Sequence, residues 1–182
     1  LYIMKKNKYT HHPYIHMTVI TILVILLIIC LHEIYFKDTV KWNQHYYINL
    51  DHREDRRKNV HRQFKRLGIH KPNRFPAIKN DLHGGIGCGL SHVGVLKNAK
   101  QKDWDYVIVM EDDIVFHDPE ETKRKINRVI NSDISWDVII VGSIVSEPTK
   151  HINDDCVKAL GGISSTIMYI VNKHYYDTLI DM

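Results

Sequence analysis

The chain has 182 residues, of which 44% are hydrophobic and 25% are charged, and its formal net charge is +4. This length allows one α/β domain with a tail and argues against a second enzymatic domain, because domains commonly have about 100–150 residues. The composition is ordinary for a globular protein and argues against an intrinsically disordered body. The three cysteines lack the short paired spacings of a zinc site, although a Cys88–Cys156 disulfide stays open.

The first predicted element is an apolar segment near the N-terminus. Residues Met17–Leu31 read MTVITILVILLIICL, and an apolar triplet at 34–36 extends the run. The strictly apolar part is shorter than the roughly 20 residues of a membrane span, but flanking aromatic and histidine side chains can occupy the interfaces. We therefore expect a tail at 1–16 and a transmembrane signal-anchor at 17–36. A cleaved signal peptide and a buried core helix are the alternatives.

The charges around this segment predict its orientation. Lysines precede the run, whereas acidic residues offset the lysines that follow it. By the positive-inside rule this favours a cytoplasmic N-terminus. We expect a single-pass type II membrane protein whose catalytic domain is lumenal or extracytoplasmic.

After a juncture at 37–45, a strand and a basic helix are predicted. Residues Tyr46–Leu50 (YYINL) have the length and the aromatic, β-branched character of a strand. Apolar residues at Val60, Phe64 and Leu67 then predict an amphipathic helix over about 54–67. Its basic outer face fits a solvated surface as well as a phosphate-facing or membrane-facing one. No nucleic-acid reader motif accompanies the charge, so no nucleic-acid partner is expected.

The rest of the chain alternates between helices and buried strands. Glycines 84, 85 and 87 lead into a predicted helix over about 88–101, and a second helix is expected from 119 to about 131. Apolar runs predict strands at 106–110 (YVIVM), 138–141 and 168–171. This alternation predicts a mainly parallel α/β sheet.

Three consecutive carboxylates follow the strand YVIVM directly. Ligands of open α/β sheets bind outside the carboxyl ends of the strands, where Glu111 and Asp113 would lie. Two carboxylates separated by one residue can bind a hard divalent cation that also takes diphosphate oxygens. Such a cation stabilises a leaving nucleoside diphosphate during sugar transfer. An acidic cluster of this kind also suits a surface loop, a helix cap or a hydrolase metal site.

Two further segments offer groups that could bind an anion. The glycine segment GGIGCGLSH precedes a predicted helix N-terminus, whose backbone N–H groups favour phosphate, although a plain turn fits it as well. Ser91 and His92 in this segment could also be local caps. Arg53 and Arg56 follow the first strand, and a guanidinium can bind phosphate oxygens bidentately.

Four segments in order resemble glycosyltransferase family 25, which includes lipooligosaccharide and collagen-type galactosyltransferases. The segments are YINLDHREDR (Tyr47–Arg56), RFPAI (Arg74–Ile78), GIGCGLSHVGVLKNA (Gly85–Ala99) and VIVMEDDIVF (Val107–Phe116). The resemblance implies a nucleotide-diphospho-sugar transferase (GT-A-like) fold for residues 46–182. It also implies transfer of a hexose such as galactose from a UDP-sugar to an acceptor hydroxyl on a glycan or protein, with inversion and a divalent metal such as Mn²⁺.

The resemblance also assigns roles to particular residues. It implies Glu111 and Asp113 as metal and donor carboxylates with Asp112 as their neighbour, Asn49, Arg53 and Arg56 as donor-side residues, and Ser91 and His92 as lining of the same pocket. The later chain departs from the family pattern, because Ser165–Tyr169 lacks the family's histidine and a later acidic segment is missing. We therefore expect a domain that is incomplete at its C-terminus.

The acceptor side of the reaction has weaker candidates. An inverting transfer needs a base for the acceptor proton, and Asp154 and Asp155 are the candidates in this chain. Two alternatives to transfer stay open. One is an inactive family member that binds a sugar nucleotide or glycan, and the other is a metal-dependent phosphohydrolase that uses the same carboxylates.

Overall fold

The computed structural model describes residues 13–36 and 40–182, with side chains for 17–31 and 40–182. The chain forms two compact units, which divide between Thr39 and Val40. The predicted tail and juncture lie partly outside the described residues, at 1–12 and 37–39.

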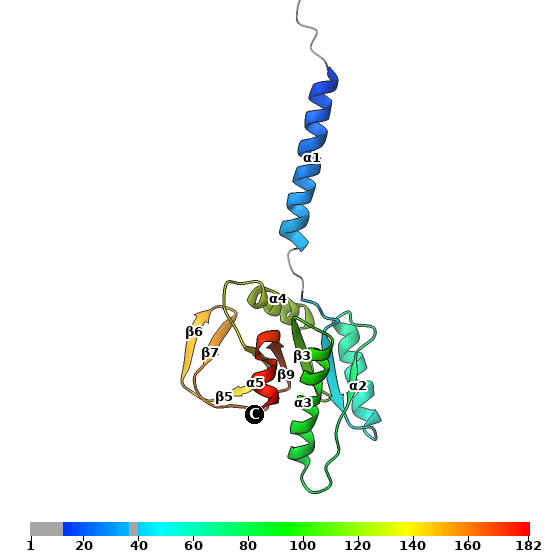
Figure 1. The fold of residues 1–182 in the computed structure, drawn as a ribbon, viewed down its shortest axis with the longest axis vertical. Helices are drawn as coiled ribbons and strands as arrows, with labels where there is room; N and C mark the ends of the chain where they lie inside the picture. Colours follow the sequence, from blue (N-terminus) through cyan, green and yellow to red (C-terminus); the bar gives the residue numbers. More distant parts are fainter. Residues whose placement is uncertain (1–12, 37–39) are drawn as a thin grey trace, which may run out of the picture. The chain divides into compact units, whose positions relative to one another are not determined.

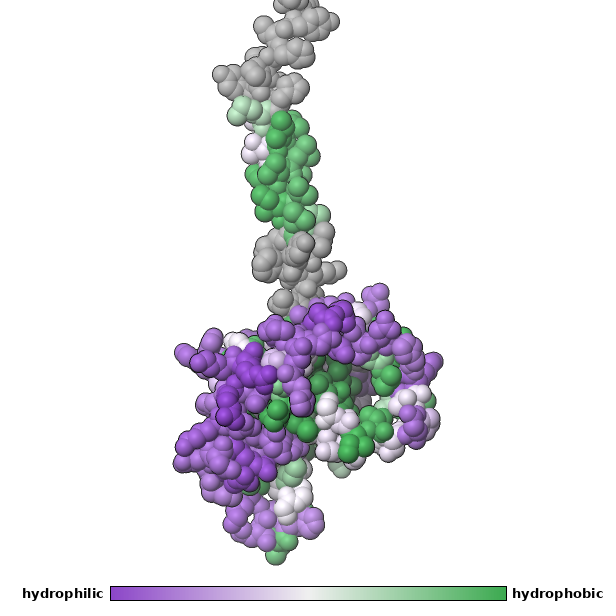
Figure 2. Space-filling model, turned by 180° about the vertical axis from the view of Figure 1, so that it is seen from behind, coloured by the Kyte–Doolittle hydropathy of each residue, from purple (hydrophilic) through white to green (hydrophobic). Residues whose placement is uncertain are grey.

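In the first unit, α1 (Pro13–Phe36) is a helix of 24 residues (Figure 1). Its side chains from 17 to 31 are exposed, and Figure 2 shows that they form a mostly apolar surface. The predicted segment 17–36 is thus helical throughout. Within the part of the chain that the structure describes, no helix combines the length and the hydropathy of a candidate membrane span.

The second unit is built on a five-stranded sheet. Its strands, in spatial order, are β2 (Arg74–Pro76), β1 (His45–Asn49), β3 (Tyr106–Glu111), β9 (Met168–Asn172) and β4 (Val138–Val141). The strand β1 pairs in parallel with both β2 and β3, whereas β9 is antiparallel to β3 and to β4. The predicted mainly parallel sheet is therefore a mixed one.

The reversal of β9 has its cause in the connection that precedes it. A parallel return needs a crossover, usually a helix. Between β4 and β9 the chain instead forms short strands, which pair as β5 (Ile144–Val145) with β8 (Ile163–Ser164) and β6 (Thr149–Asn153) with β7 (Cys156–Ala159). The chain therefore re-enters the sheet in the opposite direction, between β3 and β4.

Helices cover both faces of the sheet. They are α2 (Glu54–Arg66), α3 (Gly84–Gln101), α4 (Pro119–Ile130) and α5 (Tyr176–Ile180), which follows the 3₁₀ turn η1 (Lys173–Tyr175). Side chains of β3 alternate between two cores, because successive residues of a strand point to opposite faces. Ile108 and Met110 join the core with α2 and α4, whereas Val107 and Val109 join the core with α3 and α5.

The helix α3 begins at Gly84, earlier than the predicted start at 88. The side chain of His83 caps it by accepting a hydrogen bond from the Gly85 N–H at 3.2 Å. The glycines here lie within the helix and allow close packing. A methyl group at Gly87 would lie 2.3 Å from the carbonyl oxygen of Ile78, and one at Gly94 would lie 2.5 Å from the ring of Phe75. The segment is thus a packed helix rather than a glycine loop.

Candidate functional site

The acidic triplet lies at the carboxyl end of β3, beside the end of the parallel strand β1. Glu111 is in register with Ile48, so Asn49 ends β1 at the same edge of the sheet. The three carboxylates differ in their surroundings. Asp112 is buried, with 7% of its surface exposed, whereas Glu111 is half-buried and Asp113 is exposed.

Asn49 connects the triplet to the opening segment of the domain. Its side-chain nitrogen donates to Asp112 Oδ2 at 2.8 Å and to the carbonyl oxygen of Arg53 at 3.1 Å. Its side-chain oxygen accepts from Arg57 Nε at 3.2 Å and from Arg74 Nε at 3.1 Å. An amide group has two donor hydrogens and two acceptor lone pairs, so all four positions are used. Asn49, predicted as a donor-side residue, thus acts as an internal clamp in this structure.

Arg56 is the guanidinium that the structure brings to the triplet. Its Nη1 donates to Asp112 Oδ1 at 2.7 Å and lies 3.5 Å from Asp113 Oδ2. Arg53, which was predicted beside it, pairs instead with Asp55 through hydrogen bonds of 2.9 and 2.7 Å. With Asn49 and Arg56 both bound to Asp112, each of its carboxylate oxygens has a partner.

Glu111 and Asp113 are the carboxylates that remain for a ligand. Among the described residues, the Glu111 side chain makes no hydrogen bond, and the ion pair of Asp113 is the longer contact to Arg56. Burial, followed by the nearby Asp113 and Asp112 carboxylates, raises the pKa of Glu111, and Arg56 opposes this effect. A cation would relieve the repulsion between these like charges.

These two carboxylates fit a cation that also binds phosphate. In the part of the chain that the structure describes, no group of three or more histidine, cysteine or acidic side chains forms a ready metal site. A Mg²⁺-like ion is usually held by one or two carboxylates with substrate phosphates and water. Glu111 and Asp113 fit that donor set, whereas a site made entirely of protein ligands does not.

The face of the sheet that carries Glu111 also carries a histidine–tyrosine pair. His92 Nδ1, from α3, lies 2.6 Å from the hydroxyl oxygen of Tyr169 on β9. Burial lowers the pKa of His92, and burial with the nearby Cys88 and Glu111 raises that of Tyr169. His92 thus pairs with a residue on the face of the sheet that carries Glu111, and its role as lining of the donor pocket stays a prediction. Sequence reasoning did not predict Tyr169 as the partner of His92. The signal available was its place at the end of Ser165–Tyr169, the segment that departs from the family pattern.

Ser91 has an internal role. It is buried, with 1% of its surface exposed, and its hydroxyl donates to the Gly87 carbonyl oxygen at 2.6 Å. The same hydroxyl accepts from the Ile78 N–H at 2.8 Å. These two bonds tie the start of α3 to the segment after β2, so Ser91 supports the site through the backbone.

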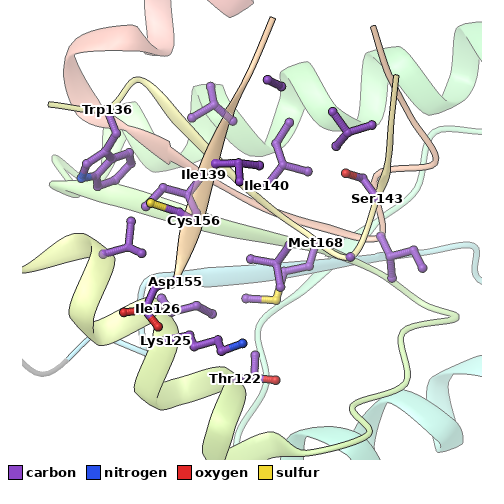
Figure 3. A pocket seen from close by; sticks show the side chains of 18 of the residues that line it. Thr122, Lys125, Ile126, Trp136, Ile139, Ile140, Ser143, Asp155, Cys156 and Met168 are labelled. Carbon is purple, nitrogen blue, oxygen red and sulfur yellow. The ribbon is translucent and has the colours of Figure 1, made fainter. Parts of the chain in front are cut away.

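The candidates for the acceptor base lie on the β6–β7 turn. Asp154 is exposed, and Asp155 forms an ion pair with Arg128 of α4. Asp155 also lines an open cavity of about 890 Å³ between α4, β4 and the β6–β7 hairpin. Figure 3 labels Asp155 among the side chains that line this cavity, together with Ile126 and Lys125. No residue of the triplet lines this cavity, and no contact joins Asp154 or Asp155 to the triplet among the described residues.

The cysteines do not form a disulfide among the described residues. Cys30, Cys88 and Cys156 are all free thiols, with Cys30 and Cys88 exposed. The disulfide that the sequence left open is thus absent from this structure.

Fold and site together define a mixed α/β domain with three carboxylates at the end of a central strand, the edge at which open α/β sheets bind their ligands. The model of the family described as glycosyltransferase family 25 (LPS biosynthesis protein) matches residues 79–182, and the chain belongs to this family. The predicted resemblance is thus confirmed. Its two opening segments, Tyr47–Arg56 and Arg74–Ile78, lie outside the matched residues.

A curated relative is similar as well. Procollagen galactosyltransferase 1-B of Xenopus laevis is 25% identical over 135 residues, and the match covers 58% of this chain and 22% of the relative. The chain therefore spans about a fifth of the length of that galactosyltransferase.

Proposed function

We propose that the protein transfers a hexose, galactose in the first instance, from a UDP-sugar to an acceptor hydroxyl of a glycan or protein, with inversion. Family membership and the distant similarity to a galactosyltransferase support the reaction class. The main support for the site is that the three carboxylates of the triplet differ in their partners. Asp112 is bound to Asn49 and Arg56, whereas Glu111 and Asp113 keep their oxygens for a ligand.

In this proposal the two outer carboxylates hold a divalent cation, Mn²⁺ by preference, together with the donor diphosphate. A bound cation would offset the negative charge that the leaving nucleoside diphosphate gains. Arg56 lies between Asp112 and Asp113, so its guanidinium also supplies positive charge at this edge. The hydrogen bond from Asn49 fixes the side chain of Asp112, the middle carboxylate of the triplet.

The acceptor proton needs a base, for which Asp154 and Asp155 remain our candidates. The ion pair with Arg128 fixes the position of Asp155. A general base typically contributes 10²–10⁴-fold to the rate. Asp155→Asn should therefore lower kcat by about 100-fold or more at an unchanged KM for the donor. A loss below tenfold would remove Asp155 from this role, and the same measurement on Asp154→Asn would then decide for Asp154.

We also propose that the N-terminal segment anchors the protein as a single-pass type II membrane protein with a lumenal or extracytoplasmic catalytic domain. The apolar run and the exposed apolar side chains of α1 support this. The protein should stay in the membrane fraction after alkaline carbonate extraction and resist added protease in sealed vesicles. Release by carbonate would contradict the anchor, and digestion in sealed vesicles would contradict the orientation.

The function is tested by turnover of a panel of UDP-sugars with Mn²⁺ and a mixture of glycan and peptide acceptors. We expect release of UDP that depends on both metal and acceptor, with the sugar recovered on the acceptor. Release of UMP and sugar phosphate in water alone would indicate a phosphohydrolase instead. UDP binding without any turnover would indicate an inactive binding protein. Asp113→Ala should lose this metal-dependent release of UDP. Asp133→Ala, at an exposed carboxylate outside the site, is the matched control and should keep it.

A further inference from the structure

The hydrogen bond between His92 and Tyr169 joins two elements on the face of the sheet that carries Glu111. Tyr169 lies opposite Val109 in the β3–β9 pairing, and Glu111 is two residues further along β3. Side chains two positions apart in a strand share a face, so Tyr169 and Glu111 are diagonal neighbours. The rings of His92 and Tyr169 are 5.6 Å apart between their centres. The pair therefore lies against the edge of the proposed donor site.

The chemistry of the two rings decides which one donates. Burial lowers the pKa of His92 and raises that of Tyr169, so both rings are neutral near pH 7. A neutral imidazole has one N–H donor and one acceptor nitrogen. A phenol is more acidic than a neutral imidazole, and an imidazole nitrogen is a better acceptor than a phenol oxygen. The Tyr169 hydroxyl therefore donates to Nδ1, and the ring proton of His92 resides on Nε2.

The second nitrogen of His92 is left for another partner. Among the described residues Nε2 makes no hydrogen bond, and His92 is half-buried. With its proton there, Nε2 attracts an anionic oxygen. With the proton on Nδ1 instead, Nε2 would present a lone pair and repel a phosphate. A charged imidazolium would compete with the cation at Glu111 and Asp113.

We propose that Tyr169 is a positioning residue that fixes His92 as its Nε2–H tautomer, so that His92 donates an uncharged hydrogen bond to a diphosphate oxygen of the nucleotide-sugar. This role rests on the proposed function, since it needs a nucleoside diphosphate at the triplet. It extends the site from β3 to β9, on the far side of Glu111 from Arg56.

The first test reads the tautomer without any turnover. In protein labelled with ¹⁵N at histidine, we expect the ring signals of His92 to show a protonated Nε2 and an unprotonated Nδ1. In Tyr169→Phe, which keeps the ring but loses the hydroxyl, both signals should move toward an average of the two tautomers. Tyr175→Phe is the matched control, because the Tyr175 hydroxyl makes no hydrogen bond among the described residues. A protonated Nδ1 in the wild type, or signals unchanged in Tyr169→Phe, would overturn the proposal.

The second test reads the consequence for the donor. Tyr169→Phe should weaken UDP binding with Mn²⁺, measured by calorimetry, by about 3–10-fold, the effect of one neutral hydrogen bond. The KM for the donor should rise in parallel, while kcat changes less. Thermal unfolding of the same sample shows whether the variant is folded, and a folded variant with unchanged UDP affinity would refute the role.

Failure of the proposed function would look different. If the wild type bound UDP but turned over no donor, the transferase function would be contradicted, whereas the role of Tyr169 would stand. A wild type that bound no UDP with Mn²⁺ would overturn both.

Discussion

Replacement of Asn49 by alanine should destabilise the domain far more than the loss of one small side chain suggests. The change removes four hydrogen bonds at once, to Asp112, the Arg53 carbonyl, Arg57 and Arg74. The guanidinium groups of Arg57 and Arg74 are half-exposed and can bind water instead, so the loss of their hydrogen bonds to Asn49 contributes little to the destabilisation. Asp112 is buried and keeps only Arg56, which costs about 1–3 kcal/mol.

Lost packing adds to this cost, because Asn49 has 1% of its surface exposed. With about 1 kcal/mol for the vacated space, the free energy of unfolding should fall by about 2–4 kcal/mol. Urea unfolding followed by circular dichroism measures it. Asn59→Ala on α2 is the control. Its contact to the Ile114 carbonyl oxygen is 3.5 Å long and its hydrogen bond from Arg62 is exposed, so the change should cost about 1 kcal/mol or less.

A double-mutant cycle separates the clamp from the packing. Asn49→Ala and Asp112→Ala should couple by about 1–2 kcal/mol, because each change removes the partner of the other. Equal costs for Asn49→Ala and Asn59→Ala, or additive costs for Asn49 and Asp112, would refute the clamp.

Two further predictions concern helix packing and pH. Gly87→Ala should lower the free energy of unfolding by about 1–3 kcal/mol, measured with urea, because the new methyl group would clash with the Ile78 carbonyl oxygen. Gly89→Ala has open space around it and should raise the free energy of unfolding by about 0.5–1 kcal/mol. Equal effects at the two glycines would contradict the close approach of α3 to the segment after β2. Burial lowers the pKa of His45, against a smaller opposing effect of the Trp42 carbonyl, and its Nε2 accepts from the Asn73 N–H at 2.9 Å. Below about pH 6.5 the unfolded chain therefore binds a proton at this histidine that the folded state does not bind. The free energy of unfolding should decrease as the pH is lowered, by up to about 1.4 kcal/mol per pH unit. Burial lowers the pKa of His92 as well, so His92 acts in the same direction. A slope between pH 7 and pH 5 that is the same in His45→Gln would contradict this.

The central strand and its carboxylates were predictable because their signal is local. YVIVM is a continuous apolar run, and such a run becomes a strand that is covered on both faces. The basic helix was likewise visible in the spacing of Val60 and Phe64, which are both fully buried. Fold and family could therefore be inferred from short segments and their order.

The direction of β9 and the hairpins before it could not be predicted in the same way. The direction of a strand is set by its connection, and segments such as TKHIN (Thr149–Asn153) show neither clear alternation nor an apolar run. The function of the glycines in α3 was also hidden, because a sequence does not show which backbone a helix will approach. Glycine is the residue that both a tight turn and a close backbone approach require, so the sequence does not distinguish the two.

The site was only partly predictable for a similar reason. The sequence places Asp112 far from Asn49 and Arg56, and only the pairing of β1 with β3 brings them together. Which of three adjacent carboxylates keeps its oxygens for a ligand depends on those partners. The pairing of β9 with β3 places Tyr169 on the face of the sheet that carries Glu111, and the sequence alone provides no order of strands from which to predict it.

The assignment of the cation and the diphosphate to Glu111 and Asp113 is tested most directly by calorimetric titration of UDP into the folded protein with and without Mn²⁺. Wild type and Asp133→Ala should bind UDP with equal affinity when Mn²⁺ is present, and chelation should remove most of that binding. Asp113→Ala should keep its thermal unfolding transition and lose the metal-dependent binding. Unchanged affinity in Asp113→Ala, or wild-type binding that is indifferent to chelation, would contradict the assignment.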